Sequence, residues 1–343
     1  MSDDQLNGNG IVRLTVQVVC SFVAVVATAL RFWCKFRTKQ GIHADDWFIL
    51  ATTVSYLSAV SSTIWGLFAG SKGKEISEIA ADLMAAPSAE KVTRMENYLE
   101  SLVICYILFL LTFYLAKIAI LLLYRRIFST QQFRRMCWIL MGVSTAFFIA
   151  AQVTIFVICI PFNLFWQRTR PVPPGGRCLN FDLYSLVVGT MDTVLDVAIL
   201  VLPVRAVLSL QMPVKTKALL CGIFLLGGFA IITSILRVYY MHQLNETYVN
   251  FRETEFFLNI HAATVILCAC LPIYTPLRIL AGALLARLRD GCRSSVRRLL
   301  QITGGTAKSR EKIDDHADES AFSQLESGRN IEMKPGCTKG SAK

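Results

Sequence analysis

The stretch GTMDTVLDVAILVLP, residues 189–203, carries two aspartates, Asp192 and Asp196, in an otherwise apolar run. Four positions apart on a helix, the two carboxylates lie on the same face. Inside a membrane each charge would cost about 3 kcal/mol or more, so acids placed there are expected to be paired or functional. A buried carboxylic acid that holds its proton could also act as a general acid on a lipophilic substrate. Asp192 and Asp196 are therefore candidate catalytic or binding residues, provided that the run lies in a bilayer.

The composition of the chain is typical of a membrane protein. Hydrophobic residues make up 54% of its 343 residues and charged residues 17%, and the mean hydropathy is +0.50. Soluble domains carry about 25% charged residues. The net charge of +11 favours anionic lipid at the inner membrane surface, and no nucleic-acid-binding motif accompanies it. We expect the lipid bilayer as the main partner, and no nucleic acid.

Seven apolar runs are long enough to cross a bilayer, which takes roughly 20 residues. They are residues 14–33, 47–69, 101–123, 137–160, 183–202, 218–236 and 256–277. The sequence therefore predicts an all-α fold, a bundle of seven transmembrane helices over residues 11–280. Gly227 and Gly228 in the sixth run are interpreted as positions where helices pack closely.

Basic residues predict the orientation of this bundle. The loops after the first, third and fifth runs are short and rich in Lys and Arg, whereas the first twelve residues contain neither. Positive residues gather on the cytoplasmic side of membrane proteins, which places the amino terminus outside and the carboxyl terminus inside. Asn245 stands in a glycosylation sequon, Asn-Glu-Thr, within a predicted outer loop. The orientation and the sequon therefore agree.

The segments outside the bundle differ in composition. We predict that residues 1–10 form an extracellular amino terminus and that residues 281–302 form a basic juxtamembrane segment. That segment fits either a helix lying on the inner membrane surface or an irregular basic flank. Residues 303–343 are polar, with too few apolar side chains to fold, and we expect a disordered cytoplasmic tail.

Lys117, the only lysine within a predicted span, offers a partner for one of the aspartates. It lies seven residues before Tyr124 at the inner end of the third span, and Asp196 lies seven residues before Pro203 at the inner end of the fifth. At 1.5 Å per residue both charges sit roughly 10 Å inside the helix ends. We therefore predict a structural ion pair between Lys117 and Asp196.

Asp192 then remains without an assigned partner. His261 in the seventh span reaches a similar depth, so Asp192 and His261 could line a polar cavity that serves a ligand or a proton. Alternatively, Asp192 is neutral or accepts hydrogen bonds from Thr190 or Ser185. The sequence leaves both interpretations open.

Most of the 11 cysteines lie inside spans, where a thiol is a small hydrophobic group. Cys178 is the exception, because it stands in the second outer loop. Cys159 and Cys105 are its possible partners, and we predict a disulfide with Cys159. The Cys-Ala-Cys spacing of residues 268–270 lacks the other ligands of a zinc site, so neither a metal nor a cofactor is expected.

Asp45 and Asp46 directly precede the second apolar run. Carboxylates at the start of a helix accept hydrogen bonds from its free amides and offset its positive end. Capping is the favoured interpretation of these two residues. Metal binding together with His43 is the alternative.

Motifs along most of residues 11–280 resemble the fungal rhodopsin-domain family. They are HADDW, YLAKIAILLLYRRIF, CIPFNLFW with GGRC, LDVAILVLPVRAVLSLQMPVKTK, GIFLLGGFAIITSILR and CACLPIYTPL. The resemblance implies a seven-helix fungal membrane protein, similar to satratoxin-cluster-type membrane proteins and receptor-like relatives. The polar positions it implies are Asp45, Asp46, Trp47, Lys117, Tyr124, Arg126, Asp196, Pro203 and Arg237. His261 departs from the family, whose members often carry glutamate there.

A retinal pigment is not expected, because the seventh span has no lysine for a Schiff base. Three functions stay open. The first is a receptor-like or accessory protein that binds a small lipophilic metabolite, with a cytoplasmic signalling partner or a link to secondary-metabolite biosynthesis. The second is an intramembrane cyclase or isomerase that uses Asp192 or Asp196 as general acid and His261 as its partner. A transporter is the third, and it is disfavoured because the two halves of the chain show no repeat.

Overall fold

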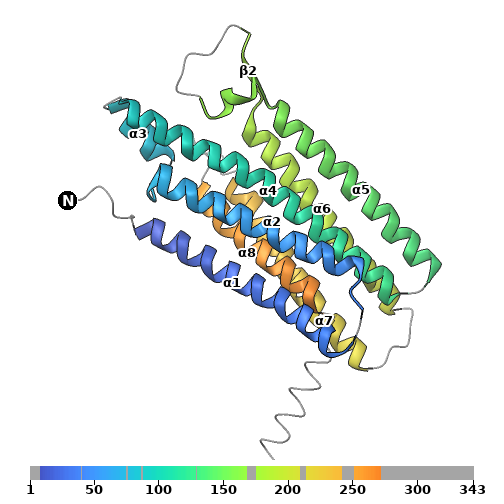
Figure 1. Cartoon of the computed structure of the whole chain (residues 1–343). Coiled ribbons are helices and arrows are strands. Elements are labelled where there is room, and N and C mark those ends of the chain that lie inside the picture. The colour runs from blue at the N-terminus through green and yellow to red at the C-terminus, as the bar shows by residue number, and fades with distance from the viewer. Residues whose placement is uncertain are drawn as a thin grey trace, which may run out of the picture. The chain divides into compact units, whose positions relative to one another are not determined.

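The computed structural model describes residues 8–39, 41–74, 76–85, 88–128, 130–167, 175–208, 214–241 and 251–271. These residues are almost entirely helical (Figure 1), which confirms the all-α prediction. The long helices are α1 (Gly8–Arg37), α2 (Ala44–Gly66), α4 (Ala89–Ile127), α5 (Gln131–Val157), α6 (Phe181–Leu208), α7 (Val214–Met241) and α8 (Phe251–Cys270). Asn245 and the predicted segments 281–302 and 303–343 lie outside the described residues.

Each predicted span coincides with most of one long helix, and each of these helices begins before its apolar run. Five of them, α1, α2, α4, α5 and α6, are long and apolar enough to cross a membrane; the apolar parts of α7 and α8 are Phe224–Tyr240 and Thr254–Cys270. The largest extension is that of α4, which begins at Ala89 after Ser88, whose Oγ accepts a hydrogen bond from Lys91 N. A capped first turn allows a helix to begin in polar sequence. A search for apolar runs does not detect such a start.

The helices pack closely where glycine removes a side chain. α2 lies along α4, and its last turn continues into a π-helix, Leu67–Ser71. A Cβ atom on Gly66 would lie 1.9 Å from Ser101 Oγ of α4. Gly227 of α7 is similar, since its Cβ would lie 2.5 Å from Leu200 Cδ1 of α6. A Cβ on Gly228 would meet nothing within 4 Å, so only the first of the two predicted packing glycines has that role.

A small group of elements gathers at the end of the bundle where α4 begins. Helix α3 (Ile76–Ala85), which the sequence did not predict, is held by an apolar cluster of Ile79, Met95, Tyr98 and Leu99. Strands β1 (Cys159–Ile160) and β2 (Arg177–Cys178) pair antiparallel, with a 3₁₀ turn at Phe162–Phe165 after β1. Cys159 stands opposite Cys178, and a disulfide joins them.

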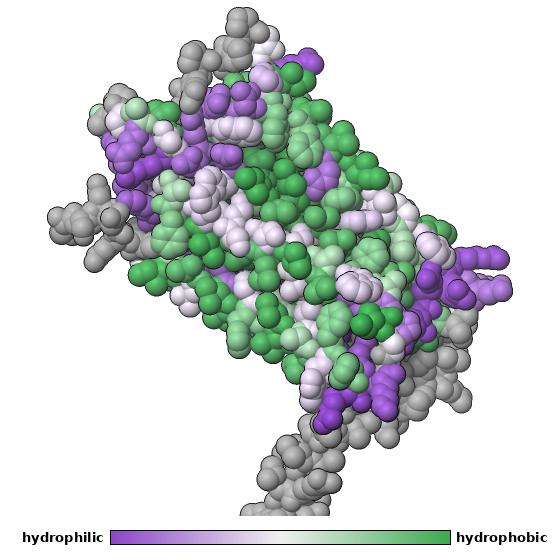
Figure 2. All heavy atoms as spheres, in the orientation of Figure 1, coloured by the Kyte–Doolittle hydropathy of each residue, from purple (hydrophilic) through white to green (hydrophobic). Residues whose placement is uncertain are grey.

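The surface of the bundle is apolar along its middle. Figure 2 shows hydrophobic side chains over the central part of one face and hydrophilic ones gathered toward both ends. Phe22 on α1, Ile139 on α5 and Leu225 on α7 are among the large apolar residues that are more than half exposed. Such extended apolar surface is rare on water-soluble monomers. It is the surface expected of a protein whose solvent is lipid.

Candidate functional site

The buried centre of the site is a lysine held by two aspartates. Lys117 Nζ of α4 lies 2.9 Å from Asp192 Oδ1 and 2.9 Å from Asp196 Oδ1, both on α6. A spacing of four residues places the two carboxylates one turn apart on one helix face, so that a single ammonium group reaches both. The structure thus places Lys117 beside Asp196, as the equal depths predict, and beside Asp192 as well.

The hydrogen bonds from Thr190 or Ser185 that the sequence allowed for Asp192 are not present among the described contacts. Thr190 Oγ1 instead donates to the main-chain oxygen of Leu186. Helical Thr and Ser side chains often satisfy themselves on the preceding turn in this way. Asp192 therefore depends on charged partners from other helices.

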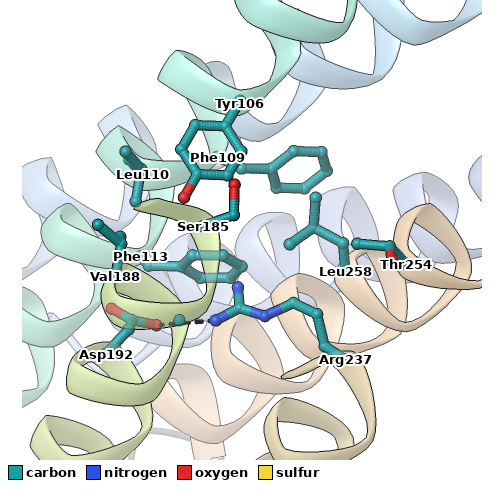
Figure 3. A pocket seen from close by; sticks show the side chains of 11 residues that line it. Tyr106, Phe109, Leu110, Phe113, Ser185, Val188, Asp192, Arg237, Thr254 and Leu258 are labelled. Carbon is teal, nitrogen blue, oxygen red and sulfur yellow. Dashed lines mark ion pairs between the residues drawn. The ribbon is translucent and has the colours of Figure 1, made fainter. Parts of the chain in front are cut away.

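Arg237 of α7 is the second cation of the site. Its Nη2 lies 3.7 Å from Asp192 Oδ2, and its guanidinium carbon lies 5.4 Å from the centre of the Phe113 ring. Figure 3 shows the side chain reaching across the pocket toward Asp192. Gly189 lets α6 approach α7 closely beside this arginine, because a Cβ there would lie 3.1 Å from Val238 Cγ2. The cluster now holds two cations and two carboxylates, a balance that reduces the cost of burying each charge.

His261 of α8 closes the other side of the cluster. Its Nε2 lies 3.5 Å from Asp196 Oδ2, and its Nδ1 lies 2.9 Å from the main-chain oxygen of Ala230. Because a carbonyl oxygen only accepts, we assign the ring proton to Nδ1. The predicted neighbours Asp192, Asp196 and His261 are thus brought together, with His261 next to Asp196 rather than Asp192.

A cavity of about 40 Å³ adjoins this cluster (Figure 3). Its wall is mainly apolar and aromatic, and its polar groups lie on Tyr106, Ser185, Asp192, Arg237 and Thr254. The apolar part is formed by Tyr106, Phe109, Phe113, Val188 and Leu258. An apolar pocket with a few convergent polar groups is the usual form of a small-molecule site.

Asp192, Asp196 and His261 also resemble a metal-ligand set, since each places one ligand atom within 4.8 Å of the others. The ammonium of Lys117 lies 2.9 Å from both carboxylates. It takes up the position between the two oxygens that a metal ion would need. We therefore interpret the two carboxylates as ion-pair partners of Lys117, with His261 next to Asp196.

A second buried cluster joins α1 and α2. Arg31 Nε lies 2.9 Å from Asp46 Oδ1, and Arg31 Nη2 lies 2.5 Å from Asp45 Oδ2. Lys35 Nζ also contacts Asp46 and lies 3.6 Å from Asp45 Oδ2. Asp46 Oδ2 accepts from His43 N at 2.9 Å, so the expected capping is present, but ion pairing is the larger role of both aspartates.

Sequence reasoning missed the cationic half of this second cluster. Arg31 was visible as the only charge in the first span, and Lys35 follows it by one helical turn. Lys35 belongs by sequence to the basic residues after the first apolar run, which were used only to predict orientation, whereas its side chain is buried. Asp45 and Asp46, which follow shortly after Lys35 in the sequence, were the signal that these two cations have partners.

A family model described as the fungal rhodopsin domain matches residues 30–279. The chain belongs to the fungal rhodopsin domain family. Together with the apolar helices, this match identifies an integral, multi-pass membrane protein.

Three relatives of the chain come from different fungi. The chain is 24% identical over 267 residues to Polyenoic acids biosynthesis gene cluster protein Ba17b of Metarhizium anisopliae, covering 74% of this chain and 70% of that protein. It is 26% identical to Satratoxin biosynthesis SC1 cluster protein 4 of Stachybotrys chartarum, over 46% of this chain and 57% of that one. Identity to Receptor GIN3 of Arthrobotrys oligospora is 26%, over 66% and 52%. No solved structure matches the chain.

The polar positions implied by the resemblance are not gathered at one site of this fungal rhodopsin domain. Lys117, Asp196 and Arg237 form the central cluster, whereas Asp45 and Asp46 form the second one. The other four lie apart: Trp47 and Arg126 are exposed, Tyr124 is buried in an apolar cluster, and Pro203 lies within α6.

Proposed function

We propose that this protein is a receptor-like or accessory membrane protein that binds a small, mainly apolar metabolite between α4, α6, α7 and α8. The observation that supports it best is the Arg237 guanidinium, which faces an aromatic pocket. Among the described residues it makes no hydrogen bond, and its ion pair with Asp192 spans 3.7 Å. A buried guanidinium has five donors to satisfy, so it favours a ligand that brings an acceptor.

The size of the cavity suggests how such a ligand would lie. A volume of about 40 Å³ takes a polar head group, whereas pockets that enclose a whole drug-sized ligand hold roughly 300 Å³ or more. The apolar body would then lie along the wall formed by Tyr106, Phe109 and Leu258. This arrangement suits a lipophilic molecule with a small polar end.

Binding can be tested without knowing the ligand. The purified protein in lipid nanodiscs is incubated with an organic extract of the producing fungus, washed, and the retained compounds are identified by mass spectrometry. We expect Leu258→Trp, which fills the cavity, to lose a compound that the unmodified protein and Leu225→Trp retain. Leu225 is the matched control because its side chain is 72% exposed on α7. Equal recovery from all three proteins would contradict the proposal.

The names of the relatives support a role in secondary metabolism. Two of them are named for polyenoic acid and satratoxin biosynthesis clusters. We propose that this protein assists in sensing or handling a product of a comparable pathway. Deletion of its gene should change the level of a lipophilic product in culture extracts, and unchanged extracts under all growth conditions that express the gene would count against it.

We further propose that all seven long helices span the membrane, with the amino terminus outside. The shortest, α8, has 20 residues and is about 30 Å long, the thickness of the hydrocarbon layer. In sealed microsomes we expect protease added from the cytoplasmic side to digest the tail. We also expect a glycosidase-sensitive mass shift that Asn245→Gln removes. Digestion of the tail from the lumenal side would reverse the assignment.

The geometry gives less support to the intramembrane cyclase or isomerase. Asp192 and Asp196 both act as counter-ions of Lys117, so neither presents a proton of its own to the cavity. His261 Nδ1 faces the main-chain oxygen of Ala230 and not the pocket. A catalytic role for the aspartates would require Lys117 to move away first.

A further inference from the structure

We infer that the ligand is an electrically neutral molecule whose polar end carries a hydrogen-bond donor next to an acceptor, as a primary amide does. This inference rests on the proposed function and concerns the same pocket. It follows from three features of the Arg237 and Asp192 side chains: the gap between them, the charge balance around them, and the shape of the two groups.

The gap is slightly too wide for a direct hydrogen bond. Arg237 Nη2 and Asp192 Oδ2 are 3.7 Å apart, whereas N–H···O bonds end near 3.2 Å. Asp192 Oδ2 has no hydrogen-bond partner among the described residues, and its side chain is only 5% exposed. A buried donor and a buried acceptor thus lie side by side at the pocket without satisfying each other. A group that accepts from the first and donates to the second would satisfy both.

The charges of the cluster exclude an ionic head group. Lys117 and Arg237 balance Asp192 and Asp196, and His261 adds no charge in its neutral form. An anion at Arg237 would lie against the carboxylate of Asp192, and a cation at Asp192 would lie against the guanidinium. Either would leave one uncompensated charge in a buried, apolar setting, which is strongly unfavourable. A neutral ligand leaves the balance intact.

The shape of the two groups selects among neutral ligands. A guanidinium and a carboxylate are planar, and they present donors and acceptors in fixed directions. The carbonyl oxygen of an amide would accept from Arg237 Nη2 while its N–H donates to Asp192 Oδ2. A carboxylic acid has the same pattern only when protonated, and it is ionised at neutral pH. An ester accepts but does not donate. The amide pattern therefore fits better than an acid or an ester, with the apolar chain toward Phe109 and Leu258.

Four probes with the same decyl-length chain separate these possibilities: decanamide, methyl decanoate, decanoate and decylammonium. Their effect on the thermal unfolding midpoint of the full chain in nanodiscs is titrated at pH 7. We expect decanamide to bind with a dissociation constant about tenfold or more below those of the other three. Because all four probes partition into lipid, the same titrations on Leu258→Trp supply the background.

The variant that tests the head-group contact is Arg237→Gln, which keeps a neutral donor of similar shape. Its affinity for decanamide should fall about tenfold, while Arg37→Gln, on the exposed end of α1, should not change it. If Arg237→Gln fails to fold, the four-probe order on the unmodified protein still decides the question. Tightest binding of decanoate or decylammonium, or equal binding of the ester, would overturn the inference and leave pocket binding intact. If no probe binds above the Leu258→Trp background, the proposed function fails as well.

Discussion

Arg31 Nη1 donates a hydrogen bond to the main-chain oxygen of Ala269 at 2.7 Å, although 238 residues separate the two in sequence. Ala269 lies in the last turn of α8, where carbonyl oxygens have no partner within the helix. Because the same arginine pairs with Asp45 and Asp46 at the start of α2, one side chain connects α1, α2 and α8.

Replacement of this arginine should therefore destabilise the bundle. Arg31→Met leaves Asp45 and Asp46 with Lys35 as their remaining cation, and breaking such a buried network typically costs about 3 to 5 kcal/mol. We expect a lower unfolding midpoint and less folded protein, measured by fluorescence-detected size-exclusion chromatography. Arg37→Met is the matched control, since Arg37 is exposed on the same helix. Similar abundance of the two variants would refute a structural role for Arg31.

Replacement of Lys117 should destabilise the protein more than replacement of one of its two aspartates. Lys117→Met leaves two carboxylates facing each other near only one cation, Arg237, whereas Asp196→Asn leaves Lys117 paired with Asp192. We expect the first variant to lose about 3 to 5 kcal/mol and the second clearly less. The double variant Lys117→Met/Asp196→Asn should recover part of the loss, which a double-mutant cycle measures as coupling. Additive effects would mean that the pair does not interact.

Glycine packing gives a test that involves no charge. A Cβ on Gly66 overlaps the short side chain of Ser101, which cannot move aside, so Gly66→Ala should lower the unfolding midpoint. Gly228→Ala, where a Cβ meets nothing within 4 Å, should be neutral or slightly stabilising because alanine favours helices by about 1 kcal/mol over glycine. The reverse order of the two midpoints would show that α2 and α4 do not approach as closely as described.

The disulfide between Cys159 and Cys178 should appear in non-reducing peptide maps of protein isolated from its native membrane. The bond closes a loop of 19 residues, and loops of this size contribute about 3 kcal/mol when cross-linked. Cys178→Ser should therefore lower the unfolding midpoint, while Cys20→Ser, at a half-buried free thiol, should have a small effect. A bond from Cys178 to Cys105, or none, would refute this pairing.

The fold was predictable where it depends on the length of the apolar runs. The seven runs locate the seven long helices because a bilayer demands continuous apolar sequence. Their ends were less predictable. The first turns of α4 and all of α3 have mixed polar and apolar sequence. The Ser88 cap and the packing of Ile79 against Tyr98 stabilise them, and hydropathy averaged over a stretch of sequence detects neither.

The candidate site was predictable in depth but not in detail. Equal distances from the helix ends placed Lys117 level with Asp196, since helical rise converts residue number into depth. Rotation about each helix axis decides which side chains meet, and it depends on packing between helices. That is why the contact of Asp192 with Lys117, the position of Arg237 over Phe113 and the turn of His261 toward Asp196 required the structure.

Helix α4 has 39 residues without a break, so its first turns and Lys117 belong to one rod. Met95 and Tyr98, which pack against α3 on the side we assign to the outside, lie about 30 Å along the axis from Lys117. A hydrogen-bonded helix shortens or bends little over that length unless proline, a glycine pair or a bulge interrupts it, and α4 contains neither proline nor glycine. We therefore expect a displacement of α3 against Met95 and Tyr98 to move Lys117 as well, because all three residues of α4 lie on one continuous helix.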